Sequence, residues 1–224
     1  MIKEYHKIET LFERDIATKK LVIGKYRNST VEFLKDAVWQ FTEKVDGTNI
    51  RVHWDGHQVS FAGRTDRAQI PKHLLVKLEE LFGGEVNEEM FEQTFGEKEV
   101  TLYGEGYGQK IQTNGYIDGV DFILFDVFVG DLPLARENVK NIAEIFNIGV
   151  VPIIFEGTLQ EGIDYVKQHN KTRICGGFYG AFMEGLVARP KVEVCDRLGN
   201  RIIVKIKYND FKEENNAKKN NRTN

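Results

Sequence analysis

The first grouping in this sequence that could do covalent chemistry is Lys44 in the stretch Glu43-Lys44-Val45-Asp46-Gly47-Thr48-Asn49. An alternating apolar segment ends at this lysine, and the Asp-Gly pair predicts a tight turn. A lysine that is oriented and partly desolvated at a strand end can act as a nucleophile once its amine loses its proton. Lys-x-Asp-Gly also occurs as an ordinary surface turn, so the hypothesis depends on the residues that follow.

Further charged residues stand at the ends of apolar segments, where the apolar pattern gives no reason for them. They are Arg64, Glu105, Asp126, Glu184, Lys205 and Lys207. Each alone could be a solvated surface charge. Together they supply an amine nucleophile, cations for phosphates and carboxylates for a divalent metal, and the aromatic residues beside them supply a wall for a base. This set predicts attack on a phosphoric anhydride.

The elements that must position these residues follow from hydrophobic periodicity. Two-residue alternation and apolar runs predict strands at 38–43, 50–54, 58–62, 100–105, 122–128, 150–155, 182–188 and 201–207. Helical spacing predicts helices from Pro71, at 87–95, at 136–147 and after a capping box at Thr158. Residues 1–35 carry mixed helix and loop signals, with Ile8, Leu11 and Phe12 at helical spacing. The sequence predicts a mixed α+β fold of mostly antiparallel strands, without an evident domain boundary.

Composition excludes several protein classes. The 224 residues carry a net charge of −3, and the segment from Arg201 to Asn224 is locally basic. No apolar run approaches the ~20 residues of a membrane span, and the N-terminus does not resemble a signal peptide. Two cysteines, Cys175 and Cys195, favour a reduced cytoplasmic protein over a disulfide scaffold, and their spacing predicts no zinc site.

The ordered motifs resemble those of the covalent nucleotidyltransferases, which are the ATP-dependent polynucleotide ligases and the mRNA capping enzymes. The closer resemblance is to the phage-type RNA ligase 2 family, and it extends from about Tyr5 to about Glu214. The motifs are Lys44 to Asn49, Gly63-Arg64-Thr65, Gly104-Glu105, Phe122 to Asp126, Glu184 to Val187 and Lys205-Ile206-Lys207. The stretch Gly104 to Gln112 and the closing Tyr208-Asn209-Asp210-Phe211 support the resemblance.

This resemblance implies a nucleotidyltransferase (ATP-grasp-like) domain over residues 1–211, with the active site between its sheets. Residues 212–224 are then a polar basic tail, which we expect to be disordered. Family members typically add a C-terminal domain that engages nucleic acid, and no such accessory domain is expected in this chain. Its basic end or a partner would supply the missing surface. A cytoplasmic location is expected, as for a phage or viral protein acting in a host cell.

The resemblance also implies a reaction, in which Lys44 attacks the α-phosphorus of ATP and carries AMP. The AMP passes to an RNA 5′-phosphate, and a 3′-hydroxyl then displaces it to seal the strand, in a role that we expect to be RNA repair. Since a lysine amine with a pKa of ~10.4 is protonated at neutral pH, we expect Lys205 and Lys207 to favour the neutral form by like-charge repulsion. They would also neutralise the departing phosphates.

Further roles are implied by position in the motifs. Glu184 resembles the metal-associated glutamate, acting on Mg²⁺ (or Mn²⁺) through water. The remaining nucleotide contacts are expected from Glu43 and Val45 beside the nucleophile, Asn49 at the α-phosphate, Arg64 at ribose or phosphate, Glu105 at the ribose, and Phe125 and Val187 on the two faces of the adenine.

Asp46 departs from the histidine of some members of the closest group, which leaves the subgroup open. The alternatives are a DNA ligase or a GTP-dependent capping-type enzyme, and a non-catalytic domain that only binds nucleic acid.

Overall fold

The computed structural model describes residues 2–112, 116–174 and 181–211. The chain forms two compact units, each with its own sheet and hydrophobic core. The first unit comprises Met1–His6 and Asp46–Val151, and the second comprises Lys7–Val45 and Pro152–Asn224. No shift in composition marks the passage between Val45 and Asp46. That residues 1–211 act as one domain stays a prediction, and the tail at 212–224 lies outside the described residues.

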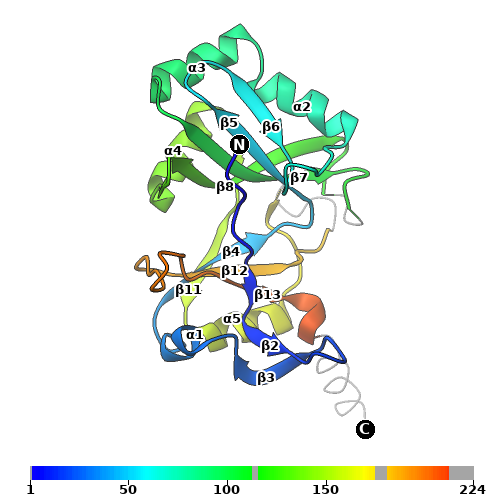
Figure 1. Cartoon of the computed structure of the whole chain (residues 1–224). Coiled ribbons are helices and arrows are strands. Elements are labelled where there is room, and N and C mark those ends of the chain that lie inside the picture. Colours follow the sequence, from blue (N-terminus) through cyan, green and yellow to red (C-terminus); the bar gives the residue numbers. More distant parts are fainter. Residues whose placement is uncertain (1, 113–115, 175–180, 212–224) are drawn as a thin grey trace. The chain divides into compact units, whose positions relative to one another are not determined.

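The first unit is built on a sheet in the order β10-β8-β7-β5-β6, with β9 paired to β8. Figure 1 labels β5, β6, β7 and β8 of this sheet. All neighbours are antiparallel except β10 and β8. The strands are β5 (Thr48–Trp54), β6 (Val59–Ala62), β7 (Val100–Gly108), β8 (Val120–Val129), β9 (Leu132–Pro133) and β10 (Gly149–Val150). The helices are α2 (Lys72–Phe82), α3 (Glu85–Phe95) and α4 (Arg136–Ile145).

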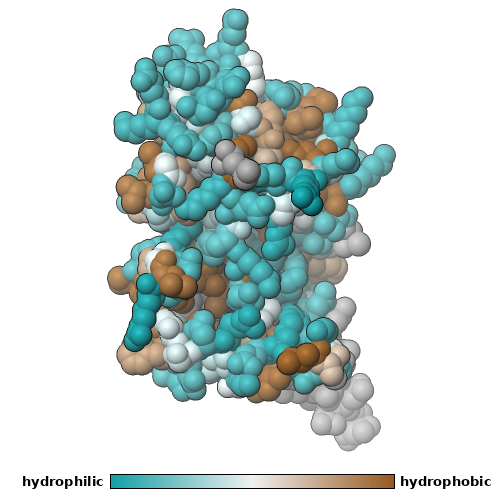
Figure 2. Space-filling view, in the orientation of Figure 1, coloured by the Kyte–Doolittle hydropathy of each residue, from teal (hydrophilic) through white to brown (hydrophobic). Residues whose placement is uncertain are grey.

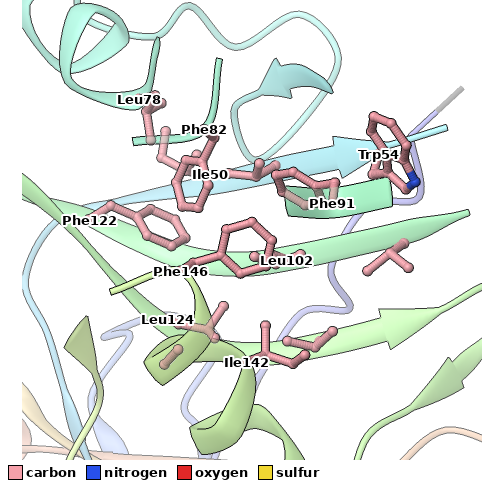
Figure 3. Packing of buried hydrophobic residues seen from close by; sticks show 14 of the residues in the cluster. Ile50, Trp54, Leu78, Phe82, Phe91, Leu102, Phe122, Leu124, Ile142 and Phe146 are labelled. Carbon is pink, nitrogen blue, oxygen red and sulfur yellow. The ribbon is translucent and has the colours of Figure 1, made fainter. Parts of the chain in front are cut away.

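One face of this sheet packs against the three helices. Alternate residues of β5 point to the same face, so Ile50, Val52 and Trp54 enter the core together. Figure 3 shows aromatic rings from the helices and from β8 gathered over them. Phe91 is at the centre, with ring centroids 5.6 Å from Trp54 and 4.4 Å from Phe146. This packing fixes which residues of β5 face the other way.

A β-bulge in β8 determines the orientation of Phe125. Gly104 pairs with Leu124 and Tyr103 pairs with Asp126, so Phe125 is an extra residue in β8. The bulge lets both Leu124 and Val127 enter the core. Phe125 and the fully buried Asp126 instead contact Tyr5 of the N-terminal segment, whose hydroxyl donates to Asp126 Oδ2 at 2.7 Å.

The second unit contains a five-stranded sheet in the order β1-β13-β12-β4-β11, which is antiparallel except for the pair β1 and β13. The strands are β1 (Glu9–Thr10), β4 (Trp39–Lys44), β11 (Ile153–Gly157), β12 (Gly185–Pro190) and β13 (Val204–Lys207). A separate two-stranded sheet joins β2 (Phe12–Arg14) to β3 (Leu21–Tyr26), and a short helix α1 (Ser29–Phe33) follows.

Helix α5 (Leu159–Gln168) packs on the core face of the five-stranded sheet. Thr158 begins it with the predicted capping box, in which the Thr158 hydroxyl accepts from the Glu161 amide and Glu161 bonds back to the Thr158 amide. Trp39 and Phe41 lie on this face, and Gly162 has no side chain because a Cβ there would lie 2.3 Å from Phe41. These contacts fix the orientation of β4.

The predicted α+β class with mostly antiparallel sheets is confirmed. The helical spacing of Ile8, Leu11 and Phe12 did not predict their structure. This segment forms β1 and β2, and β1 pairs with β13, which is distant in sequence. The predicted strand at 150–155 is two strands, β10 and β11, in different sheets. Likewise β4 and β5 flank the Asp-Gly turn but belong to different sheets, so they do not form a hairpin.

The surface in Figure 2 is mostly hydrophilic, with hydrophobic residues in small groups. Exposed large hydrophobic side chains include Ile16, Phe33, Leu132 and Leu198, which come from different parts of the chain. Scattered exposed apolar residues are usual on protein surfaces. Within the described part of the chain, no helix is long and apolar enough to cross a membrane.

Candidate active site

Lys44 is the last residue of β4, in the second unit. Because Trp39 and Phe41 enter the core, alternation places Lys44 on the opposite, solvent-side face of the sheet. Its Cα partner on β12 is Gly185, which in turn pairs with Lys207 on β13. The two lysines therefore lie in one row across three strands, with about 4.8 Å between neighbouring strands.

A carboxylate joins the two lysines. Glu184 Oε2 accepts from Lys44 Nζ, and Glu184 Oε1 accepts from Lys207 Nζ. The side chains are 22% (Lys44), 17% (Glu184) and 32% (Lys207) exposed. The cluster is thus partly desolvated but open to a ligand, and it carries a net charge of +1.

Gly185 makes this arrangement sterically feasible. A Cβ at this position would lie 2.0 Å from the Ile206 carbonyl oxygen and 2.8 Å from Lys207 Cα. Its φ of 157° is also one that other residues rarely adopt. The Glu184 amide donates to the Lys44 carbonyl, and the Tyr208 amide donates to the Glu184 carbonyl, so backbone bonds hold the carboxylate between the two lysine strands.

Lys205 and Val187 complete this face. They are direct partners on β13 and β12, and Val187 also pairs with Thr42 on β4. Burial lowers the pKa of Lys205, and the nearby charges of Lys207 and Lys44 lower it further. No carboxylate forms an ion pair with Lys205 in the described ranges. The face therefore presents an unpaired cation and an apolar side chain beside the Lys44–Glu184–Lys207 cluster.

Electrostatics keep Glu184 ionised. Burial alone would raise its pKa, but the charges and hydrogen bonds of Lys44 and Lys207 outweigh burial and hold the pKa below the ordinary glutamate value. The carboxylate is therefore negative at neutral pH, as a group that organises two ammonium groups must be.

Glu43, next to Lys44 in sequence, lies on the other face of β4. It is 2% exposed and continues the core-facing series of Trp39 and Phe41. Its carboxylate accepts from the Thr172 hydroxyl and, at 2.7 Å, from the Arg173 amide. Burial raises the pKa of Glu43, and these hydrogen bonds oppose the rise. Its role in adenine recognition stays a prediction, and these contacts give it a structural one.

In the first unit, two of the predicted site residues, Asn49 and Glu105, lie side by side. They are direct partners on β5 and β7, on the sheet face opposite the core. Asn49 Oδ1 is buried and has no hydrogen-bond partner among the described residues. An unsatisfied buried acceptor costs about 1–3 kcal/mol, which is typical of a site built for a ligand. Gly47 lies against Glu105, since a Cβ there would be 2.7 Å from Glu105 Cγ.

Arg64 and Phe125 also belong to the first unit. Arg64 is exposed in the loop between β6 and α2, and Phe125 is half-buried at the bulge of β8. Val45 is 4% exposed and directly follows β4. The structure thus groups Lys44, Glu184, Val187, Lys205 and Lys207 on one face in the second unit, and Asn49 with Glu105 in the first. That the two groups serve one nucleotide stays a prediction.

Some supporting residues carried no signal in the sequence. The Tyr116 hydroxyl accepts a hydrogen bond from the Asp46 amide at 2.9 Å, next to the lysine motif. Thr172, which holds Glu43, is equally far from any recognisable motif. Glu105 stands between two glycines, and a Cβ would meet the Phe122 ring at Gly104 and the Leu74 side chain at Gly106. Core packing therefore explains these two glycines.

The carboxylates near the lysine cluster indicate how a metal could be held there. No group of three or more His, Cys, Asp or Glu side chains that could hold a metal occurs in residues 2–112, 116–174 and 181–211. Glu184 is the acid of the lysine cluster, and both of its oxygens bind lysines. These residues fit a metal that contacts one carboxylate through water and takes its other ligands from a bound molecule.

Residues 37–207 match the sequence model of the family described as RNA ligase. The chain belongs to the RNA ligase family. The match begins just before β4 and ends at Lys207, so it includes every residue of the lysine cluster. A search among curated proteins found no match for this RNA ligase family member.

Solved structures of the Naegleria gruberi RNA ligase share the fold of this chain. A mutant with ATP and Mn has 18% sequence identity to this chain and a TM-score of 0.60. The match covers 94% of this chain and 61% of the solved chain. A second mutant with ATP and Mn has a TM-score of 0.61 at 19% identity, and one with AMP and Mn has 0.59 at 19%. The latter two each cover 93% of this chain and 61% of the other. This family member therefore spans about three fifths of the solved chains.

Proposed function

We propose that this protein is an ATP-dependent RNA ligase of the RNA ligase 2 type, which seals a 5′-phosphate to a 3′-hydroxyl in RNA repair. The observation that carries the proposal is the cluster at the end of β4. Lys44 lies beside the Glu184 carboxylate, with Lys205 and Lys207 on the same sheet face, inside the segment that matches the RNA ligase family. The Naegleria gruberi ligase structures with ATP and with AMP support a nucleotide at this site.

In the first step, Lys44 Nζ attacks the α-phosphorus of ATP. The nitrogen–phosphorus bond forms as the bond from that phosphorus to the bridging oxygen breaks, so pyrophosphate leaves and AMP stays on the lysine. The amine must give up a proton to react, and its ion pair with Glu184 must open. Lys205 and Lys207 stand where cations would offset the charge of the departing phosphates.

The second and third steps transfer the AMP. An oxygen of the RNA 5′-phosphate attacks the lysine-bound phosphorus, which breaks the nitrogen–phosphorus bond and forms a 5′–5′ pyrophosphate. A 3′-hydroxyl then attacks the RNA phosphate, a phosphodiester forms and AMP leaves. Lys44 is released for another cycle, so one ATP is converted to AMP and pyrophosphate for each sealed bond.

The first unit contributes nucleotide contacts in this proposal. The Asn49 amide faces the α-phosphate, Glu105 binds the ribose hydroxyls, and Arg64 binds ribose or phosphate. Phe125 and Val187 enclose the adenine, and Glu43 and Val45 contribute near it. The direct pairing of Asn49 with Glu105 supports this grouping.

A divalent metal, Mg²⁺ or Mn²⁺, would polarise the phosphates and offset their charge. Glu184 is the residue that would hold it, through water. The Mn in the Naegleria gruberi ligase structures supports this requirement.

Adenylylation of the protein tests the proposal. Wild-type protein is incubated with Mg²⁺ and ATP labelled at the α-phosphorus, and label on the protein is measured after denaturation. We expect label from ATP in the wild type and none in Lys44→Ala. Label from GTP but not ATP would refute the ligase and favour a capping-type enzyme. Label retained in Lys44→Ala would refute the assigned nucleophile.

A second experiment identifies the strand that is sealed. Nicked duplexes carry a 5′-phosphate and differ only in the strand that supplies the 3′-hydroxyl, which is RNA or DNA. Sealing of the RNA 3′-hydroxyl strand in preference to the all-DNA nick is expected. Equal or better sealing of the all-DNA nick would favour a DNA ligase, and labelling of the protein without sealing of either nick would show that a partner or a further segment is required.

A further inference from the structure

Arg51 is a buried cation that the proposed chemistry does not use. It lies on β5 between Asn49 and His53, so it points away from the core residues Ile50 and Val52. Its side chain is 0% exposed. A buried charge is costly unless its donors are satisfied, so the contacts of Arg51 indicate what it holds.

The guanidinium binds two points of one loop. Nε donates to the Gly63 carbonyl at 2.7 Å, and Nη2 donates to Asp66 Oδ1 at 2.9 Å. A third nitrogen, Nη1, donates to the Ile2 carbonyl of the N-terminal segment. Gly63 and Asp66 lie on either side of Arg64 in sequence. Arg51 therefore holds the loop immediately before and soon after the residue expected to contact the nucleotide.

The loop itself is compact. The Ala68 amide donates to the Thr65 carbonyl at 3.0 Å, and a Cβ on Gly63 would lie 2.9 Å from the Ala68 Cβ. Gly63 is buried, whereas Arg64 is exposed, and no carboxylate pairs with Arg64 in the described part of the chain. The loop has a fixed base and presents an arginine that is available to an anion.

Arginine suits this task better than lysine would. Its planar guanidinium has five donors in a fixed fork, and here three different nitrogens bind three separate acceptors. A lysine at position 51 would place one ammonium group at the end of a flexible stem. It could replace the charge but not the simultaneous hold on Gly63, Asp66 and Ile2.

We propose that Arg51 is a positioning residue, which fixes the Gly63–Asp66 loop so that Arg64 is presented to a phosphate or ribose of the nucleotide. The role of Arg64 rests on the proposed function, and the fixing of the loop does not. Arg51 acts through Arg64, so removing Arg51 should matter only while Arg64 is present.

A double-mutant cycle tests the connection to the reaction. Arg51→Met, Arg64→Ala and the double variant are compared with wild type by the rate of adenylylation at varied ATP concentration. We expect Arg51→Met to raise KM for ATP at least five-fold in the wild-type background and less than two-fold in the Arg64→Ala background. Arg51→Lys should not restore KM. Equal effects of Arg51→Met in both backgrounds would overturn the proposal, and Arg67→Ala serves as the control for an exposed arginine of the same loop.

Trypsin tests the loop without using activity. It cleaves after arginine, so the rates of cleavage after Arg64 and Arg67 report how firmly the loop is held, and the exposed Arg197 is the internal control. Arg51→Met should increase cleavage at Arg64 and Arg67 at least ten-fold and leave cleavage at Arg197 unchanged. Unchanged cleavage in the loop would overturn the proposal.

Asp66→Asn covers the case in which Arg51→Met fails to fold, because it weakens one contact and keeps the guanidinium. It should accelerate cleavage in the loop alone. If Asp66→Asn folds and the loop is cut no faster than in wild type, the proposal is wrong. Absence of adenylylation in the wild type would refute the proposed function and with it the role of Arg64, while the cleavage rates would still decide whether Arg51 fixes the loop.

Discussion

Glu43 and Lys44 are consecutive residues of β4, and their side chains lie on opposite faces of one sheet. Lys44 binds Glu184 on the solvent side, whereas Glu43 is buried and binds Thr172 and the Arg173 amide. A substitution of Lys44 therefore alters its cluster with Glu184 and Lys207, whereas a substitution of Glu43 alters the attachment of the Thr172 segment to the sheet.

Removing the Thr172 hydroxyl should destabilise the protein. In Thr172→Val, the buried Glu43 carboxylate loses a donor, and we expect the free energy of unfolding at pH 7 to fall by about 1.5–3 kcal/mol. Burial already raises the pKa of Glu43, so the loss should shrink as the pH falls through that raised pKa and the carboxyl becomes neutral. Urea unfolding of Thr172→Val and wild type across pH 4–8 measures this. The Thr172 hydroxyl also accepts from the Ile174 amide at 3.0 Å, so part of the loss should remain in the Glu43→Ala background. A loss as large in that background as in the wild type would contradict the assigned contact with Glu43.

Replacing Glu184 by glutamine should abolish most adenylylation. The amide keeps the shape but removes the negative charge that both lysines bind. We expect the rate of Lys44 labelling by ATP to fall at least ~100-fold, as for loss of a preorganised electrostatic contact. Circular dichroism should show an unchanged fold, and near-normal labelling would exclude Glu184 from the reaction.

Glu184 should also make stability depend on pH. Its pKa in the folded protein is below the ordinary glutamate value, because the charges and hydrogen bonds of the two lysines outweigh burial. A depressed carboxyl pKa contributes stability above the unfolded-state pKa, and this contribution is lost as the pH falls through the folded-state pKa. The difference in free energy of unfolding between wild type and Glu184→Gln should therefore be constant near neutral pH and shrink below about pH 4.5. A difference that grows on acidification would contradict this assignment.

We expect Lys205 to lower the stability of the folded protein and to support adenylylation. Burial, with the charges of Lys207 and Lys44, lowers its pKa, so the folded protein penalises the charged form. Lys205→Met should raise the unfolding midpoint temperature at pH 7 and strongly reduce adenylylation. Differential scanning calorimetry beside the labelling assay measures both. A lower midpoint at pH 7 would show that Lys205 has a stabilising partner.

Gly185 should tolerate no side chain. In Gly185→Ala, a Cβ would lie 2.0 Å from the Ile206 carbonyl oxygen, and β12 and β13 would have to separate. We expect the free energy of unfolding to fall by about 1–3 kcal/mol, and labelling to fall with it because Glu184 moves away from Lys207. Gly149→Ala is the control, since its nearest contact is 3.5 Å from Ile123. Equal effects of the two substitutions would contradict a steric role.

Local sequence pattern predicted much of the fold. The positions of α2 and α3, the capping box at Thr158 and the end of β4 at Lys44 depend on neighbouring residues, and the structure contains them. The pattern misled in the first 35 residues, where helical spacing of Leu11 and Phe12 competes with pairing to β13, nearly 200 residues later. A short stretch of sequence carries no information about which distant strand it will pair with.

The sequence likewise predicted the parts of the candidate site that depend on neighbouring residues, and not those that depend on distant ones. The alternation Trp39, Phe41, Glu43 already indicates that Glu43 faces the core, although its proximity to Lys44 suggested otherwise. Its partner Thr172 is 129 residues away, and no motif marks it. The burial of Arg51 could not be predicted either. An arginine between apolar strand residues is usually a solvated charge, and only the structure shows that this one is buried.

The pairing of β4 with β12, and of β12 with β13, has a consequence for synthesis on the ribosome. Lys44 is made early, but its partner Glu184 follows 140 residues later, and the strand of Lys205 and Lys207 comes later still. A nascent chain therefore holds Lys44 without the groups that bind it in the folded protein. Only a molecule that has been translated to β13 can assemble the cluster, so under the proposed function unfinished chains would form no lysine-bound AMP.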